Sequence, residues 1–115
     1  MALIYADEDV WNALSDGERE AIYERYRTFD QEARTNGAIV DGAELAPSSA
    51  ATTVRVRDGE TLVSDGPFAE TKEALGGYYL LECGSLDEAL ALAARIPGAD
   101  HGAVEVRPTY GEESS

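Results

Sequence analysis

Two helix-start signals set the plan of this chain, because each one introduces a helix between stretches that have strand character. Ser15 and Ser85 both stand three residues before a glutamate, the pattern of a capping box. After the first, apolar residues recur at helical spacing and predict a helix over 16–36. The second introduces an Ala- and Leu-rich helix over 85–96.

Short apolar or alternating segments surround these helices and predict the strands. They are residues 3–5, 38–46, 52–57, 60–64, 78–83 and 103–107. The alternation in 52–57 is typical of a half-buried strand, and Asp58-Gly59 after it is a strong type I′ hairpin signal. We expect residues 7–14 to form a connection with Trp11 and Leu14 as its anchors.

The order of elements is strand, helix, strand, hairpin, strand, helix, strand. This order predicts an α+β fold, a ferredoxin-like split βαβ sandwich with an inserted hairpin. At this length one domain is expected, over residues 1–110, followed by a disordered tail at 111–115.

Two helices cover only one face of such a sheet, and side-chain parity indicates what lies on the other. The expected residues of that uncovered face are Tyr78, Leu80, Glu82, Glu105 and Arg107, with Arg55 and Arg57 as further candidates. A face so apolar at its centre predicts packing against a second copy across a two-fold axis. The alternative is an antiparallel sheet face left in water.

Charge and composition restrict the classes of partner. Nine Lys and Arg stand against 23 Asp and Glu, a net charge of −14, which argues against direct binding of nucleic acid or an anionic membrane. A lone cysteine, Cys83, leaves no internal disulfide and no multi-Cys zinc site. The N-terminus has neither a basic region nor a cleavage site, so we expect no signal peptide and a cytoplasmic protein.

Asp65 is the candidate catalytic residue, because it stands in a turn before Gly66-Pro67 where a carboxylate would be presented at the mouth of a cavity between the sheets. The alternative is an Asx turn, in which the side chain bonds its own backbone. The candidate ligand-binding residues are Tyr5, Lys72, Tyr78, His101 and Arg107. For Lys72 and His101 a solvated side chain is the competing interpretation. The acidic residues lack metal-loop spacing, so no metal or cofactor is expected.

The run Val-Ser-Asp-Gly-Pro-Phe-Ala-Glu-Thr-Lys-Glu-Ala-Leu-Gly-Gly-Tyr-Tyr at 63–79 resembles the signature of the DGPF-domain family, part of the YCII-related superfamily. The likeness extends to residues 51–59, 96–99 and 104–108. The resemblance implies a dimeric α/β barrel of two ferredoxin-like protomers. It also implies a proposed His–Asp pair in the superfamily with the histidine on the first helix, but residues 16–36 contain no histidine, so that pair is not carried over.

Three functions follow as hypotheses. The first is a homodimeric module that binds a small anionic or aromatic molecule or has a regulatory role, without established catalysis. The second is a small enzyme with lyase- or isomerase-like acid–base chemistry on a polar or aromatic substrate, using Asp65 with a tyrosine or Arg107. The third is a protein partner of an extracytoplasmic-function sigma factor, which the family resemblance implies for some members.

Overall fold

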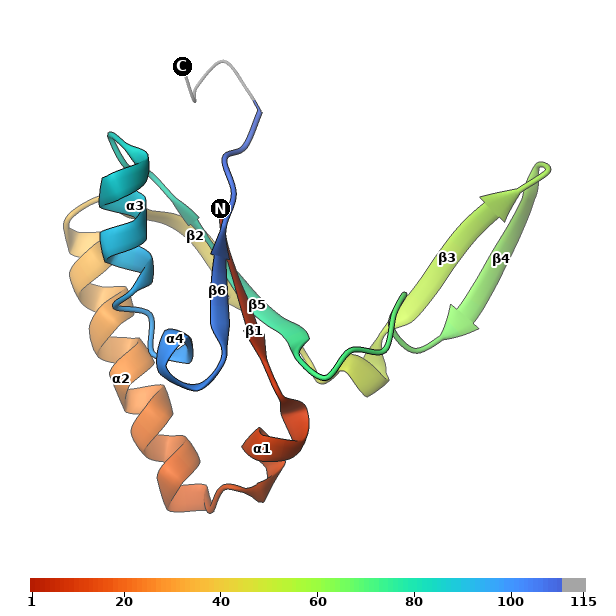
Figure 1. Cartoon of the computed structure of the whole chain (residues 1–115), viewed down its shortest axis with the longest axis horizontal. Coiled ribbons are helices and arrows are strands. Elements are labelled where there is room, and N and C mark those ends of the chain that lie inside the picture. Colours follow the sequence, from red (N-terminus) through yellow and green to blue (C-terminus); the bar gives the residue numbers. More distant parts are fainter. Residues whose placement is uncertain (111–115) are drawn as a thin grey trace.

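The computed structural model describes residues 1–110 (Figure 1), so the expected tail at 111–115 lies outside the described residues. Its helices and strands in chain order are β1 (Ala2–Ala6), α1 (Glu8–Ala13), α2 (Asp16–Thr35), β2 (Ile39–Glu44), the 3-10 turn η1 (Ser48–Ala50), β3 (Thr52–Arg57), β4 (Glu60–Asp65), β5 (Ala74–Leu81), α3 (Leu86–Ala93), α4 (Gly98–His101) and β6 (Ala103–Val106).

Four strands form the main sheet in the order β2-β5-β1-β6, and every neighbouring pair is antiparallel. β5 therefore lies between β1 and β2, the two strands that α1 and α2 connect. β1 in turn lies between β5 and β6, which α3 and α4 connect. β3 and β4 pair only with each other, as a separate two-stranded sheet. The predicted α+β class is confirmed.

The core lies between one face of the main sheet and a single layer of helices, seen edge-on in Figure 1. Its buried hydrophobic side chains are Ala2, Phe29, Ala33, Ile39, Tyr79, Ala93 and Ile96. The rings of Phe29 on α2 and Tyr79 on β5 have centroids 5.5 Å apart. Gly42 leaves room for this contact, because a Cβ there would lie 2.6 Å from the Tyr79 ring. The packing therefore depends on a glycine in the neighbouring strand.

Local signals position the helices on this face. Ser15 accepts from the Glu18 N–H while the Glu18 carboxylate accepts from the Ser15 N–H, so the first predicted capping box is confirmed. In the second, Ser85 accepts from the Glu88 N–H, but the Glu88 carboxylate takes the N–H of Gly84 at 2.6 Å instead. The start of α3 is correctly predicted, but the Glu88 carboxylate bonds the N–H one residue before the expected N-cap.

Three local expectations were wrong. Residues 7–14 contain the helix α1, whose N-cap Asp7 accepts from two backbone N–H groups. The predicted helix over 85–96 ends at Ala93, and the residues after Pro97 start the short helix α4. β5 begins at Ala74, several residues before the predicted strand, because it continues to pair with the end of β1 beyond a bulge.

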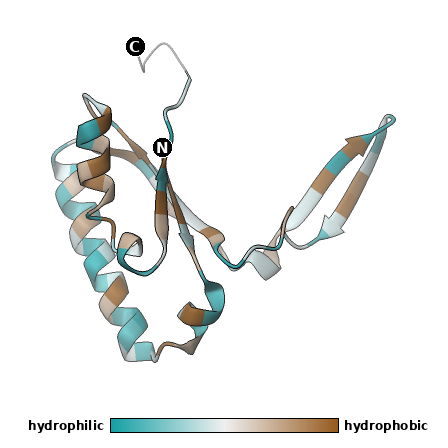
Figure 2. Ribbon diagram, in the orientation of Figure 1, coloured by the Kyte–Doolittle hydropathy of each residue, from teal (hydrophilic) through white to brown (hydrophobic). Residues whose placement is uncertain are grey.

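The β3–β4 hairpin, which we call the arm (residues 52–65), projects away from the body (Figure 1). At its tip Asp58 and Gly59 have φ of 53° and 78°, as the predicted type I′ turn requires. The expectation of a half-buried strand is wrong, because Val54 and its cross-strand neighbour Val63 are 60% and 64% exposed. No other layer formed by residues 1–110 covers the arm, and apolar residues recur along both of its strands (Figure 2).

Removal of the first cap tests how much it contributes to the fold. We expect Ser15→Ala to lower the free energy of unfolding by about 1 kcal/mol, because the Glu18 N–H loses its partner. Urea denaturation followed by circular dichroism measures this change. Ser49→Ala, an exposed serine in η1, is the matched control and should be neutral. Equal effects of the two substitutions would contradict the capping argument.

The core tyrosine makes stability sensitive to alkali. Burial raises the pKa of Tyr79 to about 12, whereas an unfolded tyrosine titrates near 10. The folded state therefore holds the phenol proton more tightly than the unfolded state. The resulting contribution to the free energy of unfolding is fully present below pH 10 and is lost as the pH rises towards 12. We expect Tyr79→Phe to remove about 2 kcal/mol of this pH dependence, measured by urea denaturation between pH 9 and 12. If the free energy of unfolding falls with pH as steeply in the variant as in the wild type, this expectation is wrong.

Candidate functional site

The uncovered face of the main sheet brings together apolar and aromatic side chains from its two central strands. Leu3 on β1 lies directly opposite Tyr78 on β5 and opposite Glu105 on β6. Tyr5 and Leu80 follow on the same face by the two-residue period of the strands. All five are partly accessible, because helices lie only on the other side. We call Leu3, Tyr5, Tyr78 and Leu80 the sheet-face cluster.

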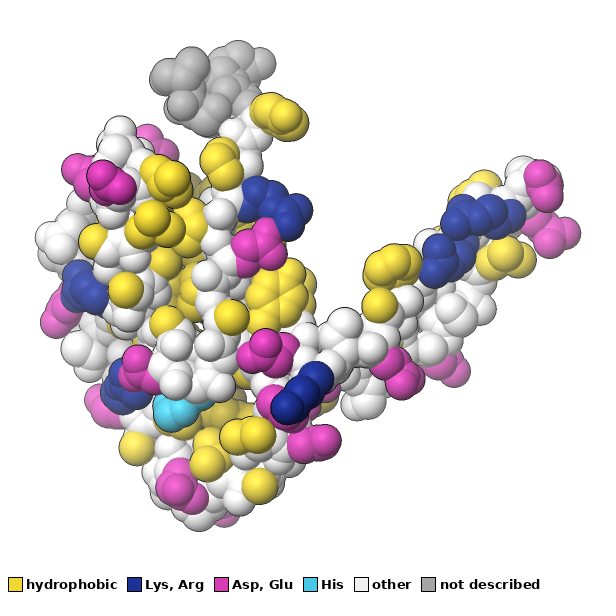
Figure 3. Space-filling view, viewed as in Figure 1, with side chains coloured by type: hydrophobic (Ala, Val, Ile, Leu, Met, Phe, Trp, Pro, Cys, Tyr) yellow, Lys and Arg dark blue, Asp and Glu magenta, His cyan; other side chains and the backbone are white. Residues whose placement is uncertain are grey.

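An ion pair lies at one edge of this cluster. The Arg107 guanidinium donates to the Glu105 carboxylate, and the side chains are 68% and 38% exposed. The backbone of Arg107 is fixed by two bonds to Met1, one of 2.7 Å from the terminal ammonium and one of 2.9 Å to the Met1 carbonyl. Figure 3 shows hydrophobic side chains on the flank of the body that faces the arm, with acidic and basic side chains beside them.

Of the predicted ligand-binding residues, the structure thus gathers Tyr5, Tyr78 and Arg107 on one face. Each has a group that orients a polar or aromatic ligand: two phenolic hydroxyls and a guanidinium fork. The guanidinium is only partly used by Glu105, because it carries five donors. Hydroxyls and a guanidinium are the kinds of group that contact anionic or aromatic molecules.

Asp65 lies elsewhere, at the end of β4 and opposite Thr52 in the arm. Its carboxylate is exposed and makes no hydrogen bond to another of residues 1–110. The turn is instead held by the Gly66 N–H donating to the Ala51 carbonyl at 2.7 Å and by Thr53 donating to the Gly66 carbonyl at 2.8 Å. Within one chain Asp65 is not on the sheet that carries Tyr5 and Tyr78.

His101 and Lys72 are both exposed, and neither lies on β1 or β5, the strands that carry the sheet-face cluster. His101, expected in a loop, is the last residue of α4. Its neighbour Asp100 pairs with Arg25 at 2.6 Å, and this bond and charge hold the pKa of the Asp100 carboxyl below its ordinary value. The carboxylate is therefore engaged by an arginine of α2. Lys72 lies in the segment between β4 and β5.

Two arginines considered for the uncovered face are not on the main sheet at all. Arg55 and Arg57 belong to β3, and the Arg55 guanidinium lies 5.2 Å from the ring centroid of Phe68. Phe68 is 74% exposed and was missed as a candidate, because its contact with Arg55 joins residues thirteen apart and is not visible in the sequence. The parity argument failed here because it assumed one continuous sheet.

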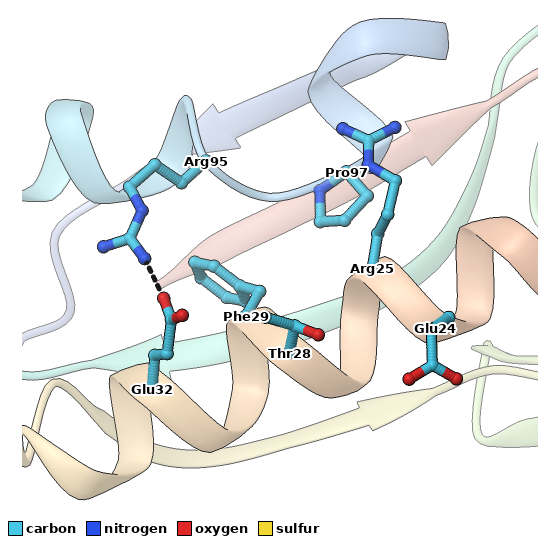
Figure 4. Close-up of a pocket in the computed structure, with 7 residues that line it drawn as sticks. All are labelled: Glu24, Arg25, Thr28, Phe29, Glu32, Arg95 and Pro97. Carbon is cyan, nitrogen blue, oxygen red and sulfur yellow. Dashed lines mark hydrogen bonds and ion pairs between the residues drawn. The ribbon is translucent and has the colours of Figure 1, made fainter.

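A shallow groove of about 290 Å³ lies on the opposite, helical side of the body (Figure 4). Arg25 and Arg95 flank it, and Phe29 and Pro97 form part of its floor. Both guanidinium groups already pair with carboxylates at 2.6 Å, Arg95 with Glu32 and Arg25 with Asp100. The groove therefore has little positive charge to spare for an anion, and it is a weaker candidate than the sheet-face cluster.

Cys83, just after β5, has a pKa raised mainly by burial, and nearby carboxylates add to the shift. This is the reverse of what activates a thiol as a nucleophile. Among residues 1–110, no three or more His, Cys, Asp or Glu side chains are grouped closely enough to bind a metal ion. In the same part of the chain no helix has the length and apolar character needed to cross a membrane.

Comparisons with known proteins agree with one another. The family model of the YCII-related domain matches residues 1–111. A relative from Rhizobium meliloti (strain 1021), named uncharacterized protein R00369, is 44% identical over 108 residues, which are 92% of this chain and 87% of that protein. Neither the name of the matched family nor the name of this relative states a function. With nearly every residue matched, the chain belongs to the YCII-related domain family.

Proposed function

We propose that this protein is a homodimeric small-molecule-binding or regulatory module of the DGPF type. Two ferredoxin-like protomers would pack their sheets face to face as a dimeric α/β barrel. The observation that carries the proposal is the sheet-face cluster, a set of large apolar and aromatic side chains in the middle of a sheet that has helices on one side only. A second sheet is the layer that would remove these groups from water.

The arrangement of the strands supports the ferredoxin-like assignment. The order β2-β5-β1-β6 places β5 between β1 and β2 and places β1 between β5 and β6, in the manner of two interlocked βαβ units, with the helices on one face. The arm is then an insertion between the second and third strands of that unit. The DGPF assignment is supported by Asp-Gly-Pro-Phe at 65–68, which follows β4 directly.

The ligand would lie between the two sheets, where copies of the cluster meet across the two-fold axis. Tyr5 and Tyr78 would bound it with ring faces and hydroxyls, and Arg107 would pair with a carboxylate or another anionic group. Closure by a second sheet would exclude water and strengthen that ion pair. A small aromatic or aliphatic carboxylate fits this chemistry, whereas the acidic outer surface repels large polyanions.

A charge placed in the sheet-face cluster should break the dimer without unfolding the chain. We expect Leu3→Glu to weaken dimerisation by at least about tenfold, because it buries a carboxylate opposite Glu105 and its two-fold copy. Sedimentation equilibrium measures the dissociation constant. Leu90→Glu, on the outer side of α3 and 48% exposed, is the matched control. If the wild-type protein is still monomeric at a concentration on the order of 100 µM, the proposed dimer is wrong.

Ligand binding is tested by thermal shift against a panel of benzoates and small dicarboxylates. A ligand that binds only the folded dimer stabilises it and so raises the melting temperature. At a hundredfold excess over its dissociation constant, the gain in the free energy of unfolding is about 2.7 kcal/mol. We expect at least one such compound, and we expect Arg107→Ala to abolish its effect. Arg27→Ala, an exposed ion-paired arginine of α2, should leave the shift intact. The proposal fails if the two variants respond alike or if no compound shifts the melting temperature.

A further inference from the structure

The arm carries an exposed apolar face that packing within a single chain does not explain. Val54, Val56 and Val63 share one of its faces and are each about 60% exposed, and no helix or strand of the body packs on them. An isolated two-stranded hairpin is marginally stable in water, and exposed valines on a free strand invite pairing with another chain. This face therefore lacks a partner among residues 1–110.

The base of the arm is firmly held, so its outward direction belongs to the fold. Leu45, which leaves β2, donates to the Gly76 carbonyl of β5 at 2.9 Å. Ser48 in η1 donates its N–H to the Glu8 carboxylate at 2.7 Å and its hydroxyl to the same group, and these bonds lower the pKa of Glu8. The arm thus leaves the body from an anchored base.

The space beside the arm is bounded by two unpartnered surfaces of the same chain. The sheet-face cluster lies on one side and the arm on the other, and the two diverge from a common base (Figures 1 and 3). The radius of gyration is 16.2 Å, compared with about 13 Å for a compact chain of this length. A second copy related by a two-fold axis presents the same pair of surfaces and would fill both spaces at once.

Charge supports a second copy as the occupant. In residues 1–51 and 74–110 there are sixteen Asp and Glu against six arginines, and all six arginines are in ion pairs. The three basic residues of 1–110 that have no ion pair all lie in residues 52–73. They are Arg55, Arg57 and Lys72, in a segment that also contains the five carboxylates Asp58, Glu60, Asp65, Glu70 and Glu73, so it is the individual arginines and not the net charge of the arm that can pair with the acidic body. Arg55 and Arg57 lie on the face of the ribbon opposite Val54 and Val56, and an arginine side chain is long enough to reach round the edge of a two-stranded ribbon to a carboxylate of the surface beneath.

We infer that the arm of each protomer is a clasp that packs its valine face on the body of a second copy, with Arg55 and Arg57 pairing with carboxylates of that copy. The inference rests on the proposed homodimer and adds a second contact region to it. It also brings Asp65 and Phe68, at the root of the arm, to the dimer instead of leaving them in solvent. The signature at 65–68 then fixes how the clasp leaves the body.

The arm can be altered without disturbing the body. Val54→Thr combined with Val63→Thr keeps the shape and strand propensity of the valine pair but adds two hydroxyls. We expect this double variant to weaken dimerisation by at least about tenfold in sedimentation equilibrium. Val10→Thr, on α1 and 55% exposed, is the matched control and should change nothing. An unchanged dissociation constant in the double variant would overturn the clasp.

A second measurement reads the contact directly. In a mixed sample of isotope-labelled and unlabelled wild-type chains, we expect isotope-filtered nuclear Overhauser effects between the methyl groups of Val54 and Val63 and protons of the other copy. A dimer without these signals overturns the clasp and leaves the sheet-to-sheet dimer standing. A monomer overturns both proposals. Loss of dimer in Leu3→Glu with intermolecular signals present in the wild type supports both.

Discussion

The contact between the main sheet and a single layer of helices is the constraint on which the rest of this structure depends. Phe29 of α2 and Tyr79 of β5 meet at its centre, and Gly42 on the neighbouring strand makes room for them. One layer buries only one face of the sheet. The unburied face is the consequence of that one-sided packing, and this face and the arm beside it are the surfaces that the proposed dimer would cover.

The sequence was informative wherever local chemistry decides the structure. The Ser15 capping box and the positive φ at Asp58 and Gly59 depend on residues within one turn, so their patterns were sufficient. Parity correctly separated Tyr79 from Tyr78 because a strand alternates whatever its neighbours are. The short helix α1 was missed, although Asp7 before two acidic residues is a usable N-terminal signal.

The same reasoning could not predict which sheet each strand joins or which of its faces is covered. The alternation of β3 is real, but alternation indicates only that a strand has two unlike faces, not that either face is covered within the chain. Arg55 and Arg57 were assigned to the main sheet because its continuity was assumed, and the separate β3–β4 sheet removes them from it. Tyr5, Tyr78 and Arg107 share a face of the main sheet, but which of their side chains lie near one another depends on the register of strands far apart in the chain.

Acidity and assembly are connected in this protein. Two bodies, each with a large excess of carboxylates, repel one another, so a face-to-face dimer needs compensation that is both apolar and cationic. The sheet-face cluster supplies apolar area, and the residues of 1–110 whose positive charge is outside ion pairs lie on the arm and the segment after it. If the arm reaches across, Arg55 and Arg57 place two positive charges against the carboxylates of the other body, although the arm itself also carries Asp58, Glu60 and Asp65. Arg107 then stays available to an anionic ligand, because the partner's surplus carboxylates are met by Arg55 and Arg57 instead.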